Sequence, residues 1–286
     1  MRLEDMRRSD NVEDLRGLTV GRTGAGVGIG TLVLVIAGYF LGISPSTMLG
    51  LLGAGEAVTQ DSAAMSAGVP TGTPTDPQGD FAAAVLGETE DVWSKYFAAR
   101  GQRYTPPILV LFTDQVSSAC GMASAAAGPF YCPGDQRLYI DLGFFNQLST
   151  EFGAPGEFAR AYVIAHEVGH HLQNLTGITE KAASLSAQQG ATGAKRVSVA
   201  VELQADCYAG VWAMQDKRVI EPGELQQALQ AAAAVGDDTL QRRTQGRVVP
   251  ETFTHGSAEQ RQRWFQRGFD GGKLENCDTF ASALPP

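Results

Sequence analysis

The apolar and polar positions along the chain predict one long apolar segment near the N-terminus. Residues 24–43, GAGVGIGTLVLVIAGYFLGI, contain no charged side chain, and the uncharged stretch extends from Arg22 to Glu56. At about 1.5 Å of rise per residue, a helix of this length matches a hydrocarbon core of about 30 Å, so the segment predicts a membrane helix. A cleaved signal peptide is the alternative, but the long segment ahead of the run and the lack of an A-x-A site close behind it argue against one.

The charges that flank this run predict its orientation. Five arginines precede it, and the next Lys or Arg after it is Lys95. By the positive-inside rule, residues 1–23 would stay in the cytoplasm and everything beyond residue 44 would be exported. Residues 44–80 are rich in Gly, Ala, Ser, Thr and Pro and gain too little from burial to become ordered. We therefore expect a flexible tether there, followed by a folded domain at 81–286.

Within the predicted domain, strands come before helices. The apolar run PPILVLFTD (106–114) and the stretch Leu138 to Leu142 predict strands, the second of them after a turn at 133–135. Helical spacing of apolar residues predicts helices at 80–101, 155–177, 197–217 and 257–272, with another that starts at Pro222 and with Asp80 and Ser257 as N-caps. This order favours an α+β fold over a doubly wound parallel sheet.

Composition and charge exclude one class of partner. The chain is 43% hydrophobic and 19% charged, which suits a globular domain with a core. The formal net charge is -9, and no cluster of Lys or Arg could follow a phosphate backbone. We therefore expect no nucleic acid partner. The sequence does not predict an oligomeric state.

All four cysteines, Cys120, Cys132, Cys207 and Cys277, follow the apolar run. Their number is even and none forms a CxxC pair, so an oxidising compartment would favour two disulfides over free buried thiols. Three connectivities are possible. We favour Cys120–Cys132, which closes a short local loop, together with Cys207–Cys277, which would tie the C-terminal tail to a helix.

The stretch AYVIAHEVGHHLQNLTG holds three of the four histidines in the chain. On a helix, His166 and His170 share one face, so both imidazoles can point at one ion. Glu167 follows the first histidine, which completes the H-E-x-x-H arrangement of two zinc ligands and a general base. His171 lies about 100° round the helix from His170, which argues against it as a ligand of the same ion. Gly169 in the interior of this helix lowers helix stability by about 1 kcal/mol relative to Ala. We therefore expect that the position requires a glycine, because a backbone or a ligand approaches closely there.

Further acidic and basic groups complete the predicted site. A catalytic zinc ion usually takes three protein ligands and keeps one position for water. Glu202 and Asp206 lie four residues apart among apolar neighbours, where a carboxylate needs a partner. We expect Glu202 to bind the ion and Asp206 to accept a hydrogen bond from a ligand histidine, unless both are solvated surface groups. His255 either lies at the surface or donates a hydrogen bond to the oxyanion of a tetrahedral intermediate.

Five blocks of sequence resemble a known family. VIAHEVGHHLQNLTG, VELQADCYAGVWA, FTHGSAEQRQRWF, SACGMASAAAGPFYCP and LYIDLGFF are similar to blocks of the bacterial putative neutral zinc metallopeptidase family, from about residue 90 to the C-terminus. The resemblance implies a zincin-like fold, with a sheet over the metal-bearing helix. It is similar to the Glu-zincin peptidases, whose E-x-x-x-D motif corresponds to Glu202 and Asp206. It also favours His255 as a residue that acts on the transition state.

We therefore expect a membrane-anchored zinc endopeptidase with one Zn²⁺ per chain, which hydrolyses exported polypeptides. Glu167 would take a proton from the attacking water and hand it to the leaving amine. We expect the substrate to lie along an edge strand near residues 117–128, and the polar segment 178–196 to form a loop that walls the cleft.

Two other functions remain open at this point. One is a non-peptidase zinc hydrolase, an amidase or a deformylase-like enzyme, although a deformylase would need a cysteine as its third ligand. The other is a binding or scaffold protein stabilised by zinc. Glu167 argues against the scaffold, because a structural site needs no general base and closes its fourth position.

Overall fold

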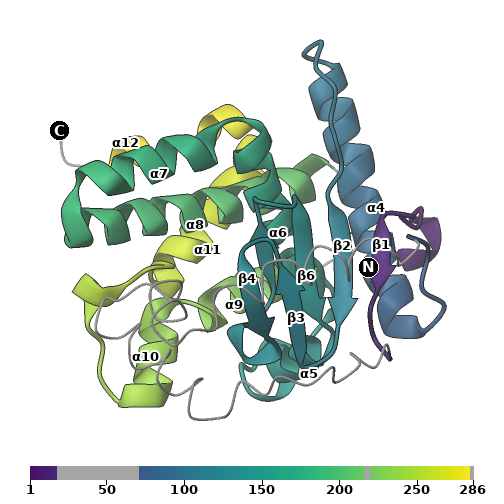
Figure 1. Ribbon diagram of the computed structural model, residues 1–286, viewed down its shortest axis with the longest axis horizontal. Helices are drawn as coiled ribbons and strands as arrows, with labels where there is room; N and C mark the ends of the chain where they lie inside the picture. The colour runs from purple at the N-terminus through teal and green to yellow at the C-terminus, as the bar shows by residue number, and fades with distance from the viewer. Residues whose placement is uncertain (18–70, 216–219, 222, 284–286) are drawn as a thin grey trace, which may run out of the picture.

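The computed structural model describes residues 1–17, 71–215, 220–221 and 223–283 (Figure 1). The predicted membrane helix at 24–43 lies outside these residues. Among the helices that are described, none combines the length and the apolar character that a bilayer crossing requires.

The described residues form an α+β structure with a small mixed sheet followed by helices, as predicted. The strands are β1 (Val12–Asp14), β2 (Ile108–Phe112), β3 (Gln115–Ser118), β4 (Gly121–Ser124), β5 (Phe130–Cys132) and β6 (Arg137–Asp141). The helices are α4 (Pro77–Ala98), α5 (Gly143–Thr150), α6 (Glu157–Leu175), α7 (Ile178–Gln188), α8 (Gly190–Gln215), α9 (Glu224–Ala234), α10 (Asp237–Gln245), α11 (Ala258–Gly271) and α12 (Phe280–Ala283).

The larger sheet has the strand order β1-β2-β6-β5. The strands β1, β2 and β6 are parallel neighbours, whereas β5 runs antiparallel to β6 at the edge of the sheet. The two strands predicted from apolar runs are confirmed as β2 and β6. The edge strand β5 contacts α6.

The strand β2 is apolar at every position because both faces of the sheet are covered. Leu109 and Leu111 belong to the main core, which also contains the buried faces of α4 and α6. Val110 and Phe112 point to the other face, where they pack with residues of the β3–β4 hairpin such as Val116. A continuous apolar run is the pattern expected for a strand that is buried on both sides.

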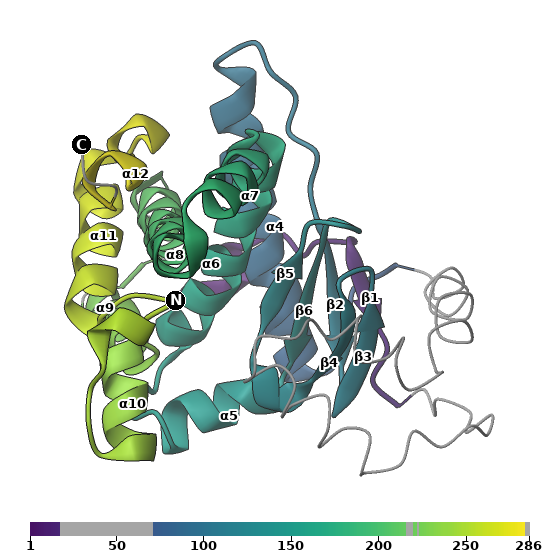
Figure 2. The same cartoon turned by 60° about the vertical axis from the view of Figure 1, so that its left-hand side comes forward.

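The helices α11, α8 and α6 follow one another toward the sheet (Figure 2). The backbones of α11 and α8 are in contact at Gly268. A Cβ atom at this position would lie 1.9 Å from the carbonyl oxygen of Cys207, so only glycine allows the contact. Both predicted disulfide pairings are formed: Cys120–Cys132 and Cys207–Cys277. The second joins α8 to the C-terminal residues, and the two together indicate an oxidising, extracytoplasmic location.

The N-terminal residues belong to the same body as the rest of the described chain. The strand β1 pairs with β2 in the sheet, and Arg8 and Arg16 form ion pairs of 2.6 Å with Asp80 and Asp76 at the start of α4. Ser9 donates a hydrogen bond to Glu90, also on α4.

This placement corrects the predicted topology. A single crossing at 24–43 would separate residues 1–17 from the sheet by a membrane, but the described contacts put both on one side. Three of the arginines that the positive-inside rule counts, Arg7, Arg8 and Arg16, have carboxylate partners in the fold.

Local structure departs from prediction at three places. Segment 178–196 is helical rather than a loop, since Ala182 on α7 packs with Val197 and Ala200 of α8. The N-cap of α4 is Asp76, which accepts a hydrogen bond from the backbone of Gly79, because Asp80 is engaged by Arg8. The helices α5 and α10 were not expected from the sequence. The N-cap Ser257 is confirmed, and a capping box accompanies it.

Candidate metal centre

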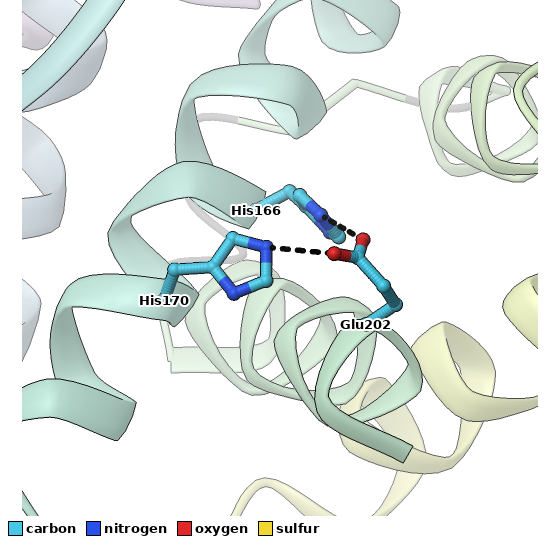
Figure 3. A group of neighbouring side chains, drawn as sticks. All are labelled: His166, His170 and Glu202. Carbon is cyan, nitrogen blue, oxygen red and sulfur yellow. Dashed lines mark hydrogen bonds and ion pairs between the residues drawn. The ribbon is translucent and has the colours of Figure 1, made fainter. Parts of the chain in front are cut away.

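Two histidines of α6 and one glutamate of α8 point toward one another (Figure 3). The Nε2 atoms of His166 and His170 lie 3.2 and 3.6 Å from the two carboxylate oxygens of Glu202. One ligand atom from each of the three residues lies within 4.8 Å of the others. The structure thus brings together the three residues expected to bind a metal ion, from two helices far apart in sequence.

Gly169 allows the two helices to come this close. A Cβ atom built on it would lie 2.9 Å from the carbonyl oxygen of Ala205 and 3.0 Å from its Cα atom. The glycine between the two histidines therefore faces the backbone of α8, as its presence inside a helix suggested. This contact sets the separation across which Glu202 reaches the histidines.

Each ligand histidine is held by a hydrogen bond at its other ring nitrogen. The Nδ1 atom of His166 lies 2.8 Å from Asp206, as predicted, and that of His170 lies 2.8 Å from Oε1 of Gln173. The amide nitrogen of Gln173 donates to the carbonyl oxygen of Val201, which assigns its oxygen to the histidine. Nδ1 of each imidazole is thus engaged by an acceptor, and Nε2 of each ring faces Glu202.

Asp206 has a second partner that the sequence did not identify. The guanidinium of Arg261 on α11 donates to both of its carboxylate oxygens, at 2.8 and 3.0 Å, and also to the hydroxyl of Tyr162. All three side chains are buried. Burial opposes ionisation of Asp206, but the charges of Arg261 and His166 outweigh it and lower the pKa of the carboxyl. The ionised carboxylate is therefore stable as the acceptor for His166.

Glu167 and His255 line the same cavity, of about 700 Å³, together with the three candidate ligands. Burial raises the pKa of Glu167, which brings this carboxylate closer to the range of a general base. The side chain of His255 is 52% exposed, and its Nδ1 atom lies 3.4 Å from Asp237. Asp237 also accepts hydrogen bonds from the backbone of residues 254–256, so it fixes this segment against α10.

His171, the third histidine of the stretch, has a structural role. Its Nε2 atom lies 2.7 Å from the carbonyl oxygen of Thr105, and its Nδ1 atom lies 3.1 Å from the hydroxyl of Tyr131 on β5. Burial lowers its pKa to about 4, so the ring is neutral near pH 7. It holds the edge strand against α6, in agreement with the expectation that it does not bind the ion.

The wall of the cavity opposite α6 differs in part from prediction. Residues 125–128 line it, as do Phe130 and Tyr131 of β5. Most of the predicted edge segment 117–128 instead forms the β3–β4 hairpin, a separate two-stranded sheet. Among the strands of the described chain, β5 is the one that contributes residues to the cavity lining.

The donor set fits a zinc ion. Two imidazole nitrogens and one carboxylate oxygen, with each histidine oriented by an acceptor at Nδ1, form the ligand combination of many catalytic zinc sites. All four cysteines are in disulfides, so no thiolate competes for the ion. These residues could hold one zinc ion per chain.

Comparison with known proteins places this arrangement in a wider group. A family model described as "Putative neutral zinc metallopeptidase" matches residues 1–280. The uncharacterized protein YpfJ of Escherichia coli K12 is 44% identical over 294 residues, which cover 99% of this chain and 100% of the relative. The uncharacterized protein Rv2575 of Mycobacterium tuberculosis H37Rv is 51% identical over 193 residues, or 63% of this chain and 64% of the relative. No solved structure matches the chain.

Proposed function

Because the chain belongs to the putative neutral zinc metallopeptidase family, we propose that it is a zinc-dependent endopeptidase that cleaves exported polypeptides. The observation that carries the proposal is the convergence of His166, His170 and Glu202 on the cavity that Glu167 also lines. A structural zinc site would need neither the cavity nor Glu167, a second acidic group beside the three candidate ligands.

In the proposed mechanism, the bound ion and Glu167 have separate roles. A bound zinc ion supplies Lewis-acid chemistry: it acidifies a water molecule and polarises the scissile carbonyl group. Glu167 takes the proton of the attacking water and passes it to the leaving amine. Burial raises the pKa of Glu167, which makes its carboxylate a stronger base toward the attacking water.

His255 and its partner Asp237 act on the developing negative charge. The hydrogen bond that Nδ1 of His255 donates to Asp237 is the main cause of the raised pKa of His255, and it leaves Nε2 as the second donor when the ring is protonated. We propose that this donor binds the oxyanion as the carbonyl carbon becomes tetrahedral. The half-exposed position lets the side chain reach a substrate in the cavity.

The substrate binds in an extended conformation along β5. This strand pairs with β6 on one side only, and its other edge faces the cavity, so a peptide can add to it through main-chain hydrogen bonds. Tyr131 is fixed to α6 through His171, which holds the edge strand at a constant distance from the metal centre.

The proposed location is extracytoplasmic, because the two disulfides form in an oxidising compartment. Membrane attachment through residues 24–43 stays a prediction, since these residues lie outside the described part of the chain. If it occurs, the contacts of β1 require residues 1–17 to lie on the same side as the metal centre.

The test compares the wild-type protein with Glu167→Gln, which keeps the shape of the side chain but removes the base. We expect both proteins to bind one zinc ion per chain, and only the wild type to cleave unstructured polypeptides. Equal cleavage by both proteins would remove Glu167 from the mechanism. A panel of N-formyl peptides and cell-wall fragments tests the amidase alternative, which would be favoured if these were hydrolysed and polypeptides were not.

A further inference from the structure

We propose that one end of the cavity is a subsite for a large apolar side chain next to the scissile bond, so that the substrates are polypeptide segments with such a residue. The subsite, called here the apolar end, is lined by Phe144, Phe152, Val163, Val235 and Leu240. This inference rests on the proposed peptidase function and specifies the substrates of the same site.

The apolar end is continuous with the metal centre. Val163 lies on α6 four residues before Glu167, so both side chains are on the same face of the helix, one turn apart. Both line the same cavity as the candidate ligands. A residue adjacent to a bond held at the metal centre is therefore within reach of Val163.

Two helices that the sequence did not predict build the outer wall. The helix α5 carries Phe144 and leads into Phe152, and the two rings lie 6.1 Å apart between their centroids. The helix α10 contributes Leu240 and is joined to the end of α5 by Arg243, which donates to the carbonyl oxygens of Glu151 and Phe152. The wall is thus a fixed surface rather than two unconnected side chains.

The large side chains of this wall are only partly buried, although they are apolar. Phe144, Phe152 and Leu240 all retain solvent exposure in the cavity. Elsewhere in the described chain, Met122, at 63%, is the one large hydrophobic side chain that stands fully exposed. Apolar surface that is exposed to water in a cleft favours ligand binding, because a ligand that covers it removes this surface from water.

The charged groups around the apolar end already have partners within the described chain. Arg261 is paired with Asp206, and Asp237 is engaged by the backbone of residues 254–256. The guanidinium of Arg243 binds main-chain oxygens and lies 5.8 Å from the centroid of the Phe152 ring. A charged substrate side chain would lose water here without gaining a new ion pair, so the site discriminates against it.

The opposite end of the cavity is different in character. Near His170 it is lined by Gln173, Thr179, Ala182 and Val201, without the paired phenylalanine rings of the apolar end. The cavity is therefore asymmetric, and a large apolar residue fits one side of the scissile bond better than the other.

The experiment uses internally quenched peptides that are identical except for the two residues that flank the central bond, each varied among Leu, Phe, Asp and Lys. We expect kcat/KM to be at least about tenfold higher for Leu or Phe than for Asp or Lys at one flanking position only. Leu240→Glu should reduce this ratio and improve cleavage of the Lys peptide. Met122→Glu, at an exposed position that does not line the cavity, is the matched control and should leave the ratio unchanged.

A second measurement separates this inference from the proposed function. Binding of the same peptides to Glu167→Gln, followed by fluorescence anisotropy, should show the same preference without any turnover. If the wild type cleaves none of the peptides but Glu167→Gln binds the apolar ones selectively, the subsite is supported and the peptidase proposal fails. Equal binding and equal cleavage of all peptides would overturn the subsite and leave the peptidase intact.

Discussion

The side-chain oxygen of Gln173 lies 2.8 Å from Nδ1 of His170, and the two residues are three positions apart on the same helix. The amide nitrogen of Gln173 is bound to α8 through the carbonyl oxygen of Val201. One side chain therefore orients a candidate ligand and connects the two helices that carry the metal centre.

The first prediction follows from this contact. Gln173→Leu removes the acceptor at Nδ1 of His170 and the tie to α8, so zinc affinity should fall by about 10–100-fold. Competition with a chromogenic chelator measures the change. Gln226→Leu, at an exposed position on α9, is the control. If Gln173→Leu bound zinc as tightly as this control, the orienting role would be excluded.

The second prediction concerns the approach of α6 to α8. Helix propensity alone would make Gly169→Ala stabilising by about 1 kcal/mol. The backbone of Ala205 occupies the space of the new methyl group, so we expect instead a lower Tm and weaker zinc binding. Gly72→Ala is the same change in open space, because no atom lies within 4 Å of the added methyl group. A Gly169→Ala protein at least as stable as Gly72→Ala would contradict the close contact.

The third prediction concerns the buried pair of Arg261 and Asp206. Arg261→Met leaves the carboxylate buried without its cation, which should cost about 3–5 kcal/mol in the free energy of unfolding. Arg263→Met removes an exposed pair with Glu259 on the same helix and should cost less than about 1 kcal/mol. Denaturant unfolding at a fixed zinc concentration compares the two variants.

The same pair has a defined pH dependence. Because the pKa of Asp206 is lowered in the folded protein, its contribution to stability is present above the ordinary carboxyl pKa of about 3.9 and is lost as the pH falls through the folded value. In Arg261→Met this pKa rises, so acid destabilisation should begin at a higher pH than in the wild type. Superimposable profiles of unfolding free energy against pH would show that Arg261 does not control Asp206.

The fourth prediction concerns the side of the membrane on which the N-terminus lies. Asp5 and Lys95 are exposed positions on the N-terminal segment and on α4. Asp5→Cys and Lys95→Cys should react equally with a membrane-impermeant maleimide in intact cells. The N-terminal segment pairs with the sheet through β1 and with α4 through ion pairs, so both positions lie on one side of a membrane. Labelling of Lys95→Cys alone would restore the topology inferred from the flanking arginines.

The parts of the site that the sequence predicted are those defined by local spacing. His166 and His170 are placed on one face by the pitch of the helix, and Glu202 and Asp206 lie on one face of the next long helix for the same reason. The close contact at Gly169 could be predicted because a glycine inside a helix has a known cost in helix stability, which a need for space offsets.

The parts that were missed depend on contacts between distant segments. Arg261 is recognisable only when α11 packs on α8, because nothing in its own helix distinguishes it from Arg263. The role of Asp237 follows from the loop that its carboxylate binds. The ion pairs of the N-terminal arginines were missed for the same reason, because their carboxylate partners lie on α4 or at its N-cap and become neighbours only in the folded domain.

The contacts of β1 have one more consequence. Residue 17 leaves the sheet close to where residue 71 returns, because Arg16 holds Asp76 and the amide of Gly72 donates to Val12. An insertion between residues 17 and 71 would therefore begin and end at one place on the described fold, and the hydrogen bonds that hold β1 in the sheet would not depend on its length.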